Sequence, residues 1–435
     1  MSTVQKTDVL VVGAGPVGMM TALMLAERGI EPMIIDSEWR TGTHSYALAL
    51  HPAALQMLDD LGLADQTLAQ AYRVDRIALY DGDRRRETIE LAQLGGDFPF
   101  LAVLRQDALE DLLERRLAAR HVRVRWNHRL TSATDAVDYV DTVVARLGKE
   151  PMGYAVVTSE PIIEKSFPVR ASYVVGADGH RSAVRQALGL SFDTVGRTDH
   201  FAVFEFATDA ELDHELRLVV HDDSLNVLWP MPDGHCRWSF QLKIAEADPS
   251  SRVKARLAVQ VGEYTFPVLT SDELCQFLQT RAPWFRGAIG DVRWSMAVRF
   301  ERRLASGFGS GRMWLAGDAA HMTGPAGVQS MNAGLHEGHE LASRITQLLR
   351  GGGSPDLLAD YARQRRGDWR RLLAIDETLE ATDATPAWLR RHAGELLACL
   401  PGYGETVGKL ASQLGLKFVP GAGQPVMTVA AAGAT

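Results

Sequence analysis

The chain has 435 residues, a hydrophobic share of 46% and a formal net charge of -8. This length supports one large core or two to three fused domains, and the mildly acidic charge argues against binding nucleic acid through its phosphates. The sequence has no signal peptide, no polybasic run and no apolar run long enough to span a bilayer, so we expect a cytoplasmic protein without a membrane span.

The cysteines are few and far apart. Cys236, Cys275 and Cys399 form no CxxC pair, which disfavours a zinc site or a disulfide framework. They predict buried free thiols in a reducing compartment, and we expect no metal.

The first forty residues predict a β-α-β unit. Residues 8–12 form a short β-branched run typical of a buried parallel strand, and residues 16–28 have helical spacing. Gly29 ends this helix, and residues 32–35 read as a second strand.

The rest of the chain changes character twice. Apolar periodicity predicts helices at residues 51–63, 107–119, 333–350 and 387–400. Strands are expected within residues 74–98, 121–126, 139–175, 201–206, 225–231, 237–242 and 313–316. The segment 139–175 suggests a hairpin, and the turn at 232–234 predicts that 225–231 and 237–242 form an antiparallel hairpin. The segment 387–400 is expected in the core or at a dimer interface, the remainder of the C-terminal part is expected to be helical, and the tail 430–435 reads as disordered.

This order predicts an α/β fold in which a Rossmann-like nucleotide domain is discontinuous. An antiparallel β-sheet substrate domain is inserted into it, and a helical segment follows. The nucleotide domain is placed at residues 1–77, 98–190 and 291–370, the β-rich domain at 78–97 and 191–290, and the C-terminal helical segment and tail at 371–435.

A glycine-rich turn directly follows the first strand. In Gly13-x-Gly15-x-x-Gly18, the first glycine allows the tight turn, the second lets a pyrophosphate approach the backbone, and the third lets the helix pack on the sheet. Pro16 and Val17 open the helix, whose N-terminus favours negative charge. Asp36 ends the second strand, where it can accept hydrogen bonds from a ribose. These residues predict dinucleotide binding without deciding between FAD and NAD.

Two later strands also end in an acid beside glycine. Asp178-Gly179 follows the strand 173–175, and Gly317-Asp318 follows the strand 313–316. Asp-Gly is also a common turn pair, so alone it has a purely structural explanation. A small-residue loop, residues 325–334, then opens a helix that can again face negative charge.

Together these motifs resemble the single-component FAD-dependent aromatic monooxygenases, the group A flavoprotein hydroxylases related to para-hydroxybenzoate hydroxylase. The order and separations of the glycine-rich turn, Asp178-Gly179 and Gly317-Asp318 are those of that family, and the likeness covers residues 8 to about 370. The nucleotide domain is then expected to be a Rossmann-like FAD-binding domain.

The resemblance implies a role for each matched residue. The glycine-rich turn and Asp36 would hold the ADP half of FAD, Arg105 and Gln106 the pyrophosphate or ribitol side, and Asp318 the ribitol. Asp178 is associated with both FAD and a transient nicotinamide donor. The loop that would lie against the isoalloxazine, with its helix start stabilising negative charge, contains Pro325, Gly327, Val328, Ser330, Met331 and Asn332.

The implied reaction uses NAD(P)H and dioxygen. Through a flavin C4a-hydroperoxide, it would hydroxylate or epoxidise an aromatic, hydrophobic small molecule, such as a natural-product intermediate. The sequence does not decide between NADH and NADPH, between monomer and homodimer, or among substrates. The substrate pocket is expected near Tyr46, Trp229, Trp238 and Pro325, although strand aromatics are often only core.

No catalytic base is assigned. Candidates that also have packing or surface explanations are His44, Tyr46, His221, His235 and His321. Val328 and Ser330 stand where the family usually has glycines, which bears on the geometry of the loop. A halogenase or a reductase on the same scaffold, and a non-catalytic flavin- or ligand-binding protein, remain the alternatives.

Overall fold

The computed structural model describes residues 3–40, 49–152, 158–242, 258–261, 264–267, 269–324, 326–421 and 424–428. The predicted β-α-β unit is present as β1 (Gln5–Val12), α1 (Pro16–Glu27) and β2 (Pro32–Ile35), with β1 and β2 parallel. The apolar half of β1 is buried, as its β-branched sequence predicts.

The nucleotide sheet runs in the order β2-β1-β10-β21-β20. β10 (Thr158–Gly176) is parallel to β1, and β21 (Met313–Leu315) is parallel to β10. The register pairs Val12 with Gly176 and Gly176 with Leu315. Three strands from distant parts of the chain therefore end side by side, and each is followed by one of the acid- or glycine-containing motifs.

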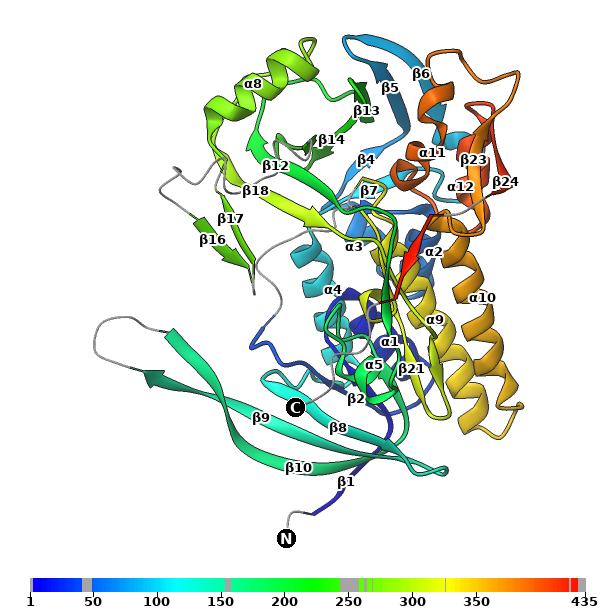
Figure 1. Ribbon diagram of the computed structural model, residues 1–435. Coiled ribbons are helices and arrows are strands. Elements are labelled where there is room, and N and C mark those ends of the chain that lie inside the picture. Colours follow the sequence, from blue (N-terminus) through cyan, green and yellow to red (C-terminus); the bar gives the residue numbers. More distant parts are fainter. Residues whose placement is uncertain are drawn as a thin grey trace.

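Helices surround this sheet. α1 packs against both α4 (Gln106–Ala119) and α9 (Gln329–Leu349), and α10 (Asp356–Leu372) packs against α9. In Figure 1, α9 and α10 run side by side along one flank of the molecule. On the opposite side, β10 forms a long antiparallel hairpin with β9 (Val140–Met152), next to β8 (His128–Asp135), as the hairpin pattern predicts.

A second sheet lies above the first in Figure 1, in the order β18-β12-β15-β14-β13-β5-β6. Its strands are β5 (Arg76–Asp81), β6 (Arg84–Glu90), β12 (Asp199–Ala207), β13 (Glu215–His221), β14 (Ser224–Met231), β15 (His235–Leu242) and β18 (Val292–Phe300). The predicted hairpin of β14 and β15 is confirmed. Because β18 pairs with β12, this sheet continues past residue 290, where we expected the inserted domain to end.

Shorter elements connect the layers. They are β3 (Ala49–Leu50), α2 (Pro52–Asp60), α3 (Ala64–Leu68), β4 (Tyr72–Val74), η1 (Leu91–Leu94), β7 (Leu101–Val103), α5 (Ala183–Ala187), β11 (Phe192–Val195), β16 (Ala258–Val261), β17 (Tyr264–Pro267), α8 (Ser271–Arg281), β19 (Arg303–Ala305), β20 (Gly309–Ser310), η2 (Gly317–Ala319) and β22 (His321–Met322). α8 covers the aromatic face of the second sheet, where Trp238 stacks on Phe240 and Phe240 on Phe277.

Two expectations from the sequence are wrong. Residues 121–126 form no strand: only Arg125 pairs with Ile35, in an isolated bridge, because positive φ angles at His121 (61°) and Asn127 (58°) bend the chain at both ends of the run. The C-terminal part is also not purely helical. It contains the antiparallel pair β23 (Glu377–Ala381) and β24 (Leu416–Pro420), where Leu379 alone of its strand is buried.

The predicted helix at 387–400 is broken into short turns. They are η3 (Arg390–His392), α11 (Ala393–Leu396) and η4 (Leu397–Cys399), followed by α12 (Glu405–Ser412) and β25 (Val426–Met427). The apolar side chains of α11, η4 and α12 join the main core, as the core alternative predicts.

Candidate functional site

The glycine-rich turn is built as its spacing predicts. Gly13 has a φ of 101°, and a Cβ there would overlap the carbonyl oxygen of Ala177. A Cβ at Gly18 would overlap the carbonyl of Gly13. Gly15 differs from both, because no heavy atom lies within 4 Å of a Cβ built on it. Two glycines thus serve the fold, and Gly15 leaves open space.

Asp36 is tied to this turn. Its Oδ2 accepts a hydrogen bond of 2.6 Å from the backbone N–H of Ala14, and its Oδ1 accepts one of 2.8 Å from Glu38. α1 begins at Pro16 with no side-chain cap and no acid in its first turn, so its free N–H groups and its positive dipole end face outward from the sheet edge.

The second motif contacts the first directly, through Gly13 and Ala177. Asp178 Oδ2 accepts hydrogen bonds from the backbone N–H groups of Ala183 (2.7 Å) and Val184 (3.3 Å), while its Oδ1 is buried without a hydrogen-bond partner. Burial raises the pKa of Asp178. A buried carboxylate oxygen without a partner is costly, so it marks a place where a donor from a ligand can bind.

The third motif rests on the fully buried carboxylate of Glu337. Its Oε2 accepts a 2.8 Å hydrogen bond from the backbone N–H of Gly317 and lies 2.7 Å from His321 Nε2, and its Oε1 accepts a 2.8 Å bond from Trp369 Nε1. His321 also stacks on the Trp369 ring at 3.7 Å, so this histidine is a structural anchor of the turn.

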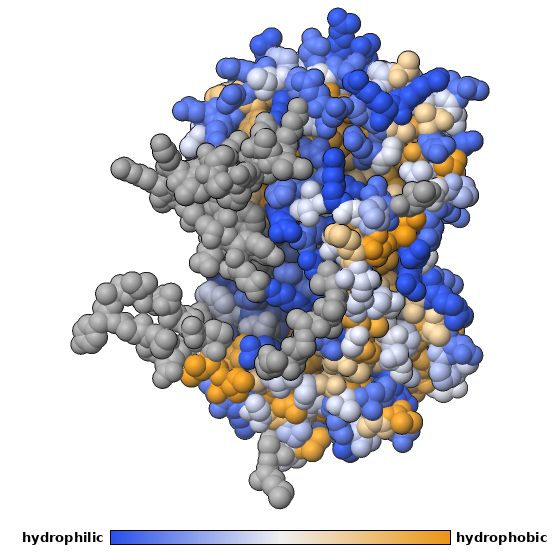
Figure 2. Space-filling view, in the orientation of Figure 1, coloured by the Kyte–Doolittle hydropathy of each residue, from blue (hydrophilic) through white to orange (hydrophobic). Residues whose placement is uncertain are grey.

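Asp318, which follows Gly317, has two properties that rarely occur together. Its side chain is solvent-exposed, yet surrounding protein raises its pKa. A carboxyl group that is accessible but surrounded by protein lines a recess. Figure 2 shows a hollow at mid-height of the face in view, with mainly hydrophilic residues around it.

The first and third motifs touch through small residues. A Cβ at Gly334 would lie 2.7 Å from Val17 Cγ2 and 2.9 Å from Gly317 Cα, and one at Gly338 would overlap Thr21. The glycines therefore let α9 approach α1 closely. The three motifs form one continuous cradle at the carboxyl edge of the nucleotide sheet.

Residues 326–332, which comprise the turn before α9 and the first four residues of that helix, are called here the capping loop. Val328 is the N-cap of α9 in the left-handed region, with φ 50° and ψ 38°. Its β-branched side chain makes this conformation a genuine outlier, which explains why a glycine suits the position. Ser330 Oγ accepts a 3.1 Å hydrogen bond from the Thr323 N–H, and Met331 is half-buried.

The remaining predicted site residues have different surroundings. Arg105, the N-cap of α4, reaches the second sheet, where its Nη1 donates to the buried Glu205 at 2.8 Å. Gln106 donates to Glu110 at 2.8 Å. Arg237 and the indole of Trp294 also donate to Glu205, so one carboxylate organises this junction between α4 and β12.

The predicted substrate-pocket residues are not all placed. Tyr46 and Pro325 lie outside the described residues, as does His44. Trp229 and Trp238 are 2% and 0% exposed, within the cores of the two layers. Both side chains pack among apolar neighbours, and the buried indole Nε1 of Trp238 has no hydrogen-bond partner.

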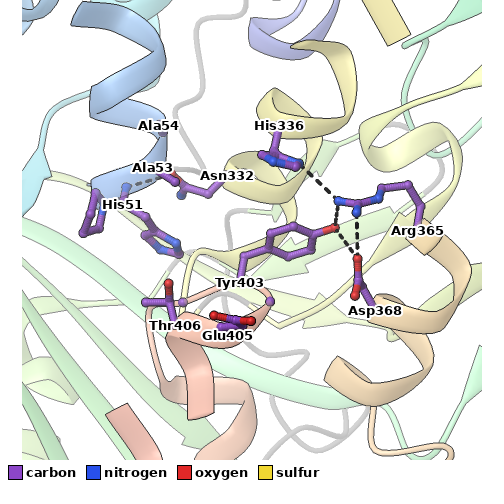
Figure 3. A pocket seen from close by; sticks show the side chains of 13 residues that line it. His51, Ala53, Ala54, Asn332, His336, Arg365, Asp368, Tyr403, Glu405 and Thr406 are labelled. Atoms are coloured by element: carbon purple, nitrogen blue, oxygen red, sulfur yellow. Dashed lines mark hydrogen bonds and ion pairs between the residues drawn. The ribbon is translucent and has the colours of Figure 1, made fainter. Parts of the chain in front are cut away.

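A pocket of about 330 Å³ lies behind the capping loop, between the starts of α2 and α12, α9 and α10 (Figure 3). Arg365 is its buried cation, but this guanidinium already contacts Asp368 at 3.0 Å, His336 Nδ1 at 3.1 Å and the Tyr403 hydroxyl. Burial lowers the pKa of His336. The cation is thus compensated within the protein, and the pocket does not favour an anion.

Other classes of site find no support in the described part of the chain. Among those residues, no group of three or more His, Cys, Asp or Glu side chains could hold a metal ion. No described helix is long and apolar enough to cross a membrane.

Comparison with known proteins gives the family. The family described as FAD binding domain matches residues 6–374, so the chain belongs to this family and FAD is its cofactor. The 6-methylpretetramide 4-monooxygenase of Streptomyces rimosus is 31% identical over 383 residues, which cover 86% of this chain and 62% of that protein. Para-nitrophenol 4-monooxygenase of Pseudomonas sp. strain WBC-3 is 27% identical and covers 82% of both chains.

Solved structures confirm the fold class. The p-nitrophenol 4-monooxygenase PnpA of Pseudomonas putida DLL-E4 superposes with a TM-score of 0.68 at 22% identity, covering 94% of both chains. A ternary complex of aklavinone-11 hydroxylase with FAD and aklavinone gives a TM-score of 0.67 at 23% identity, covering 94% of this chain and 73% of that one. The chain spans 62% of the length of its first curated relative, so the activity of the whole protein remains to be argued.

Proposed function

We propose that the protein is a FAD-dependent monooxygenase that hydroxylates an aromatic small molecule with NAD(P)H and dioxygen. The observation that carries this proposal is the convergence of three motifs, from residues 13–18, 177–179 and 317–334, on one sheet edge. The names of the relatives add support, because those compared above are a monooxygenase of a polycyclic compound and a monooxygenase of a phenol.

The residues present fit the cofactor. Gly15 offers open space to a pyrophosphate, Asp178 Oδ1 is a buried acceptor without a partner, and Asp318 is an exposed acid in a recess. We assign the ADP half to the turn at Gly13–Gly18 with Asp36, and the sugar-alcohol chain to Asp318. FAD held there would supply the redox chemistry, which is oxidation of NAD(P)H and activation of dioxygen for transfer of one oxygen atom to an electron-rich ring.

The chain supplies position and charge. α9 has 21 residues, no acid in its first turn and no side-chain cap, so its N-terminus stabilises negative charge in front of the capping loop. We assign Arg105, which is half-buried and pairs with Asp107 and Glu205, to the pyrophosphate or ribitol side of FAD.

The test is direct. Purified holoprotein is mixed with NADH or NADPH in the presence of dioxygen and candidate phenols or polycyclic aromatic ligands. Ligand-stimulated consumption of NAD(P)H and oxygen, with a product one oxygen atom heavier, supports the proposal. Tight FAD binding without reduction under any ligand would favour a non-catalytic flavoprotein, and a halogenated or reduced product would favour the other chemistries of this scaffold.

A further inference from the structure

The capping loop is hydrogen-bonded to residues 397–400, about seventy residues later in the chain. The backbone N–H of Gly327 donates to the carbonyl of Ala398 at 3.1 Å. The buried side chain of Gln329 donates both of its Nε2 hydrogens, to the carbonyls of Leu397 and Leu400, each at 2.9 Å. Residues 397–400, called here the clamp segment, thus accept three hydrogen bonds from two residues of the loop.

The clamp segment lies outside the residues that match the family, which end at 374. Figure 3 shows the chain that follows it, with Tyr403, Glu405 and Thr406, facing His51 and Asn332 across the pocket. The hydrogen bonds therefore join the matched FAD-binding region to a segment outside it.

The backbone of the capping loop is strained at Val328. Val328 holds a left-handed backbone that costs a β-branched residue free energy, and such a conformation persists only where its surroundings over-determine it. Other contacts fix its flanks: Asn332 Nδ2 donates to the Val328 carbonyl at 2.8 Å, and His51 Nε2 donates to the Gly327 carbonyl at 3.0 Å. The clamp segment accepts the remaining hydrogen bonds, from the Gly327 backbone and the Gln329 side chain.

We propose that the clamp segment holds the capping loop in its strained conformation and thereby positions it against the flavin, with Gln329 as the positioning residue. This inference rests on the proposed function, because it needs FAD to lie against the loop. Residues 397–400 would thus act on FAD binding indirectly, by holding the capping loop, whereas the cradle motifs would contact FAD themselves.

The experiment compares Gln329→Met with Gln347→Met in FAD-bound full-length protein. Methionine keeps the volume and removes the two donors. The Leu397 carbonyl then loses its bond from Gln329, and the Leu400 carbonyl keeps only its bond from the N–H of Gly402. Gln347 is exposed on the same helix and serves as the matched control. We expect Gln329→Met to raise the FAD Kd about tenfold and to change the visible absorption and circular dichroism of bound flavin, with Gln347→Met unchanged in both.

A double-mutant cycle with Val328→Gly tests the mechanism. Glycine adopts the left-handed conformation without strain, so the loop no longer needs to be held. We expect Gln329→Met to raise the FAD Kd by no more than about threefold in the Val328→Gly background, against about tenfold alone. If Gln329→Met does not fold alone, as urea unfolding of the apoprotein would show, the comparison is made between Val328→Gly and the double variant.

The outcomes separate the two proposals. Equal FAD Kd values and flavin spectra for Gln329→Met and Gln347→Met would overturn the clamp, and so would strict additivity in the cycle. A wild-type protein that binds FAD but never oxidises NAD(P)H would overturn the proposed activity and leave the clamp standing.

Discussion

At the scale of single residues, Gly15 separates a glycine kept for a ligand from glycines kept for the fold. Its backbone is ordinary, with φ -72° and ψ -179°, so the turn itself does not require glycine there. Gly13 and Gly18 have neighbouring backbone where a Cβ would lie, whereas Gly15 has none within 4 Å. The space at Gly15 is therefore the local reason for its residue type.

We predict that Gly15→Ala raises the FAD Kd about tenfold without lowering stability, because the added methyl group occupies the space that a pyrophosphate needs. Flavin fluorescence titration measures the FAD Kd, and urea unfolding of the apoprotein measures the stability. Gly367→Ala, in α10 with equally open surroundings, is the control and should leave the Kd unchanged. An unchanged Kd for Gly15→Ala would move the pyrophosphate away from this turn.

His51 predicts a pH dependence. Its ring is buried and lies behind the capping loop, and burial lowers its pKa from 6.5 to about 4. Between these values the unfolded chain binds a proton that the folded protein does not, so stability is lost as the pH falls from 6.5 to 4. The shift corresponds to about 3 kcal/mol at most.

We therefore expect His51→Gln to lose less stability than the wild type over that pH range, measured by urea unfolding at pH 7, 6, 5 and 4. His235→Gln, at the first residue of β15, controls for the loss of a histidine. Parallel pH curves for His51→Gln and the wild type would rule out His51 as a source of the acid sensitivity.

At the scale of elements, α9 joins the cradle to the helical flank. Glu337 of α9 accepts hydrogen bonds from the backbone of Gly317 and from the indole of Trp369 in α10. Gly334 and Gly338 of the same helix pack closely against α1. A motif that looks local in the sequence, Gly317-Asp318, is thus held by an acid twenty residues later. No pattern of spacing in the sequence reveals this pair, because two buried polar groups find each other only after the helices pack.

We predict that Glu337→Gln lowers the free energy of unfolding by about 2 kcal/mol, because the amide presents an N–H group to one of three donors that now share the carboxylate. Glu31→Gln, at an exposed acid between α1 and β2, should change it by less than about 0.5 kcal/mol. Equal losses in urea unfolding would mean that the buried network contributes no more than a surface acid.

At the scale of the whole molecule, the fold class and the meeting of the three motifs were predictable, because each motif follows a recognisable apolar strand. Parallel strands in one sheet bring such ends together. Two features could not be predicted, because both depend on contacts between distant segments. They are the strand pair β23–β24 and the hydrogen bonds between residues 397–400 and the capping loop. The sequence also could not decide whether Trp229 and Trp238 line a pocket or only pack in a core, because alternating aromatic residues look alike in both.

The cradle predicts how the whole protein responds to ligand. FAD at one hundred times its Kd should raise the free energy of unfolding by about 2.7 kcal/mol, seen as a higher Tm. Riboflavin at the same concentration should raise the Tm less, because it lacks the ADP half assigned to the turn at Gly13–Gly18. An equal rise with riboflavin would show that this turn does not contribute to binding.

The wide spacing of the motifs sets the time at which the protein can acquire its cofactor during synthesis. The turn at residues 13–18 is made first, but its neighbours at 177–179 and 317–334 come much later, and the segment 397–400 later still. Residues up to 334 must therefore be synthesised before the cradle is complete, and residues up to 400 before the clamp segment can bind the capping loop. Until then the parallel strands β1, β10 and β21 lack partners that lie hundreds of residues away, and such contacts form slowly. FAD can therefore stabilise a newly made chain only late in its synthesis.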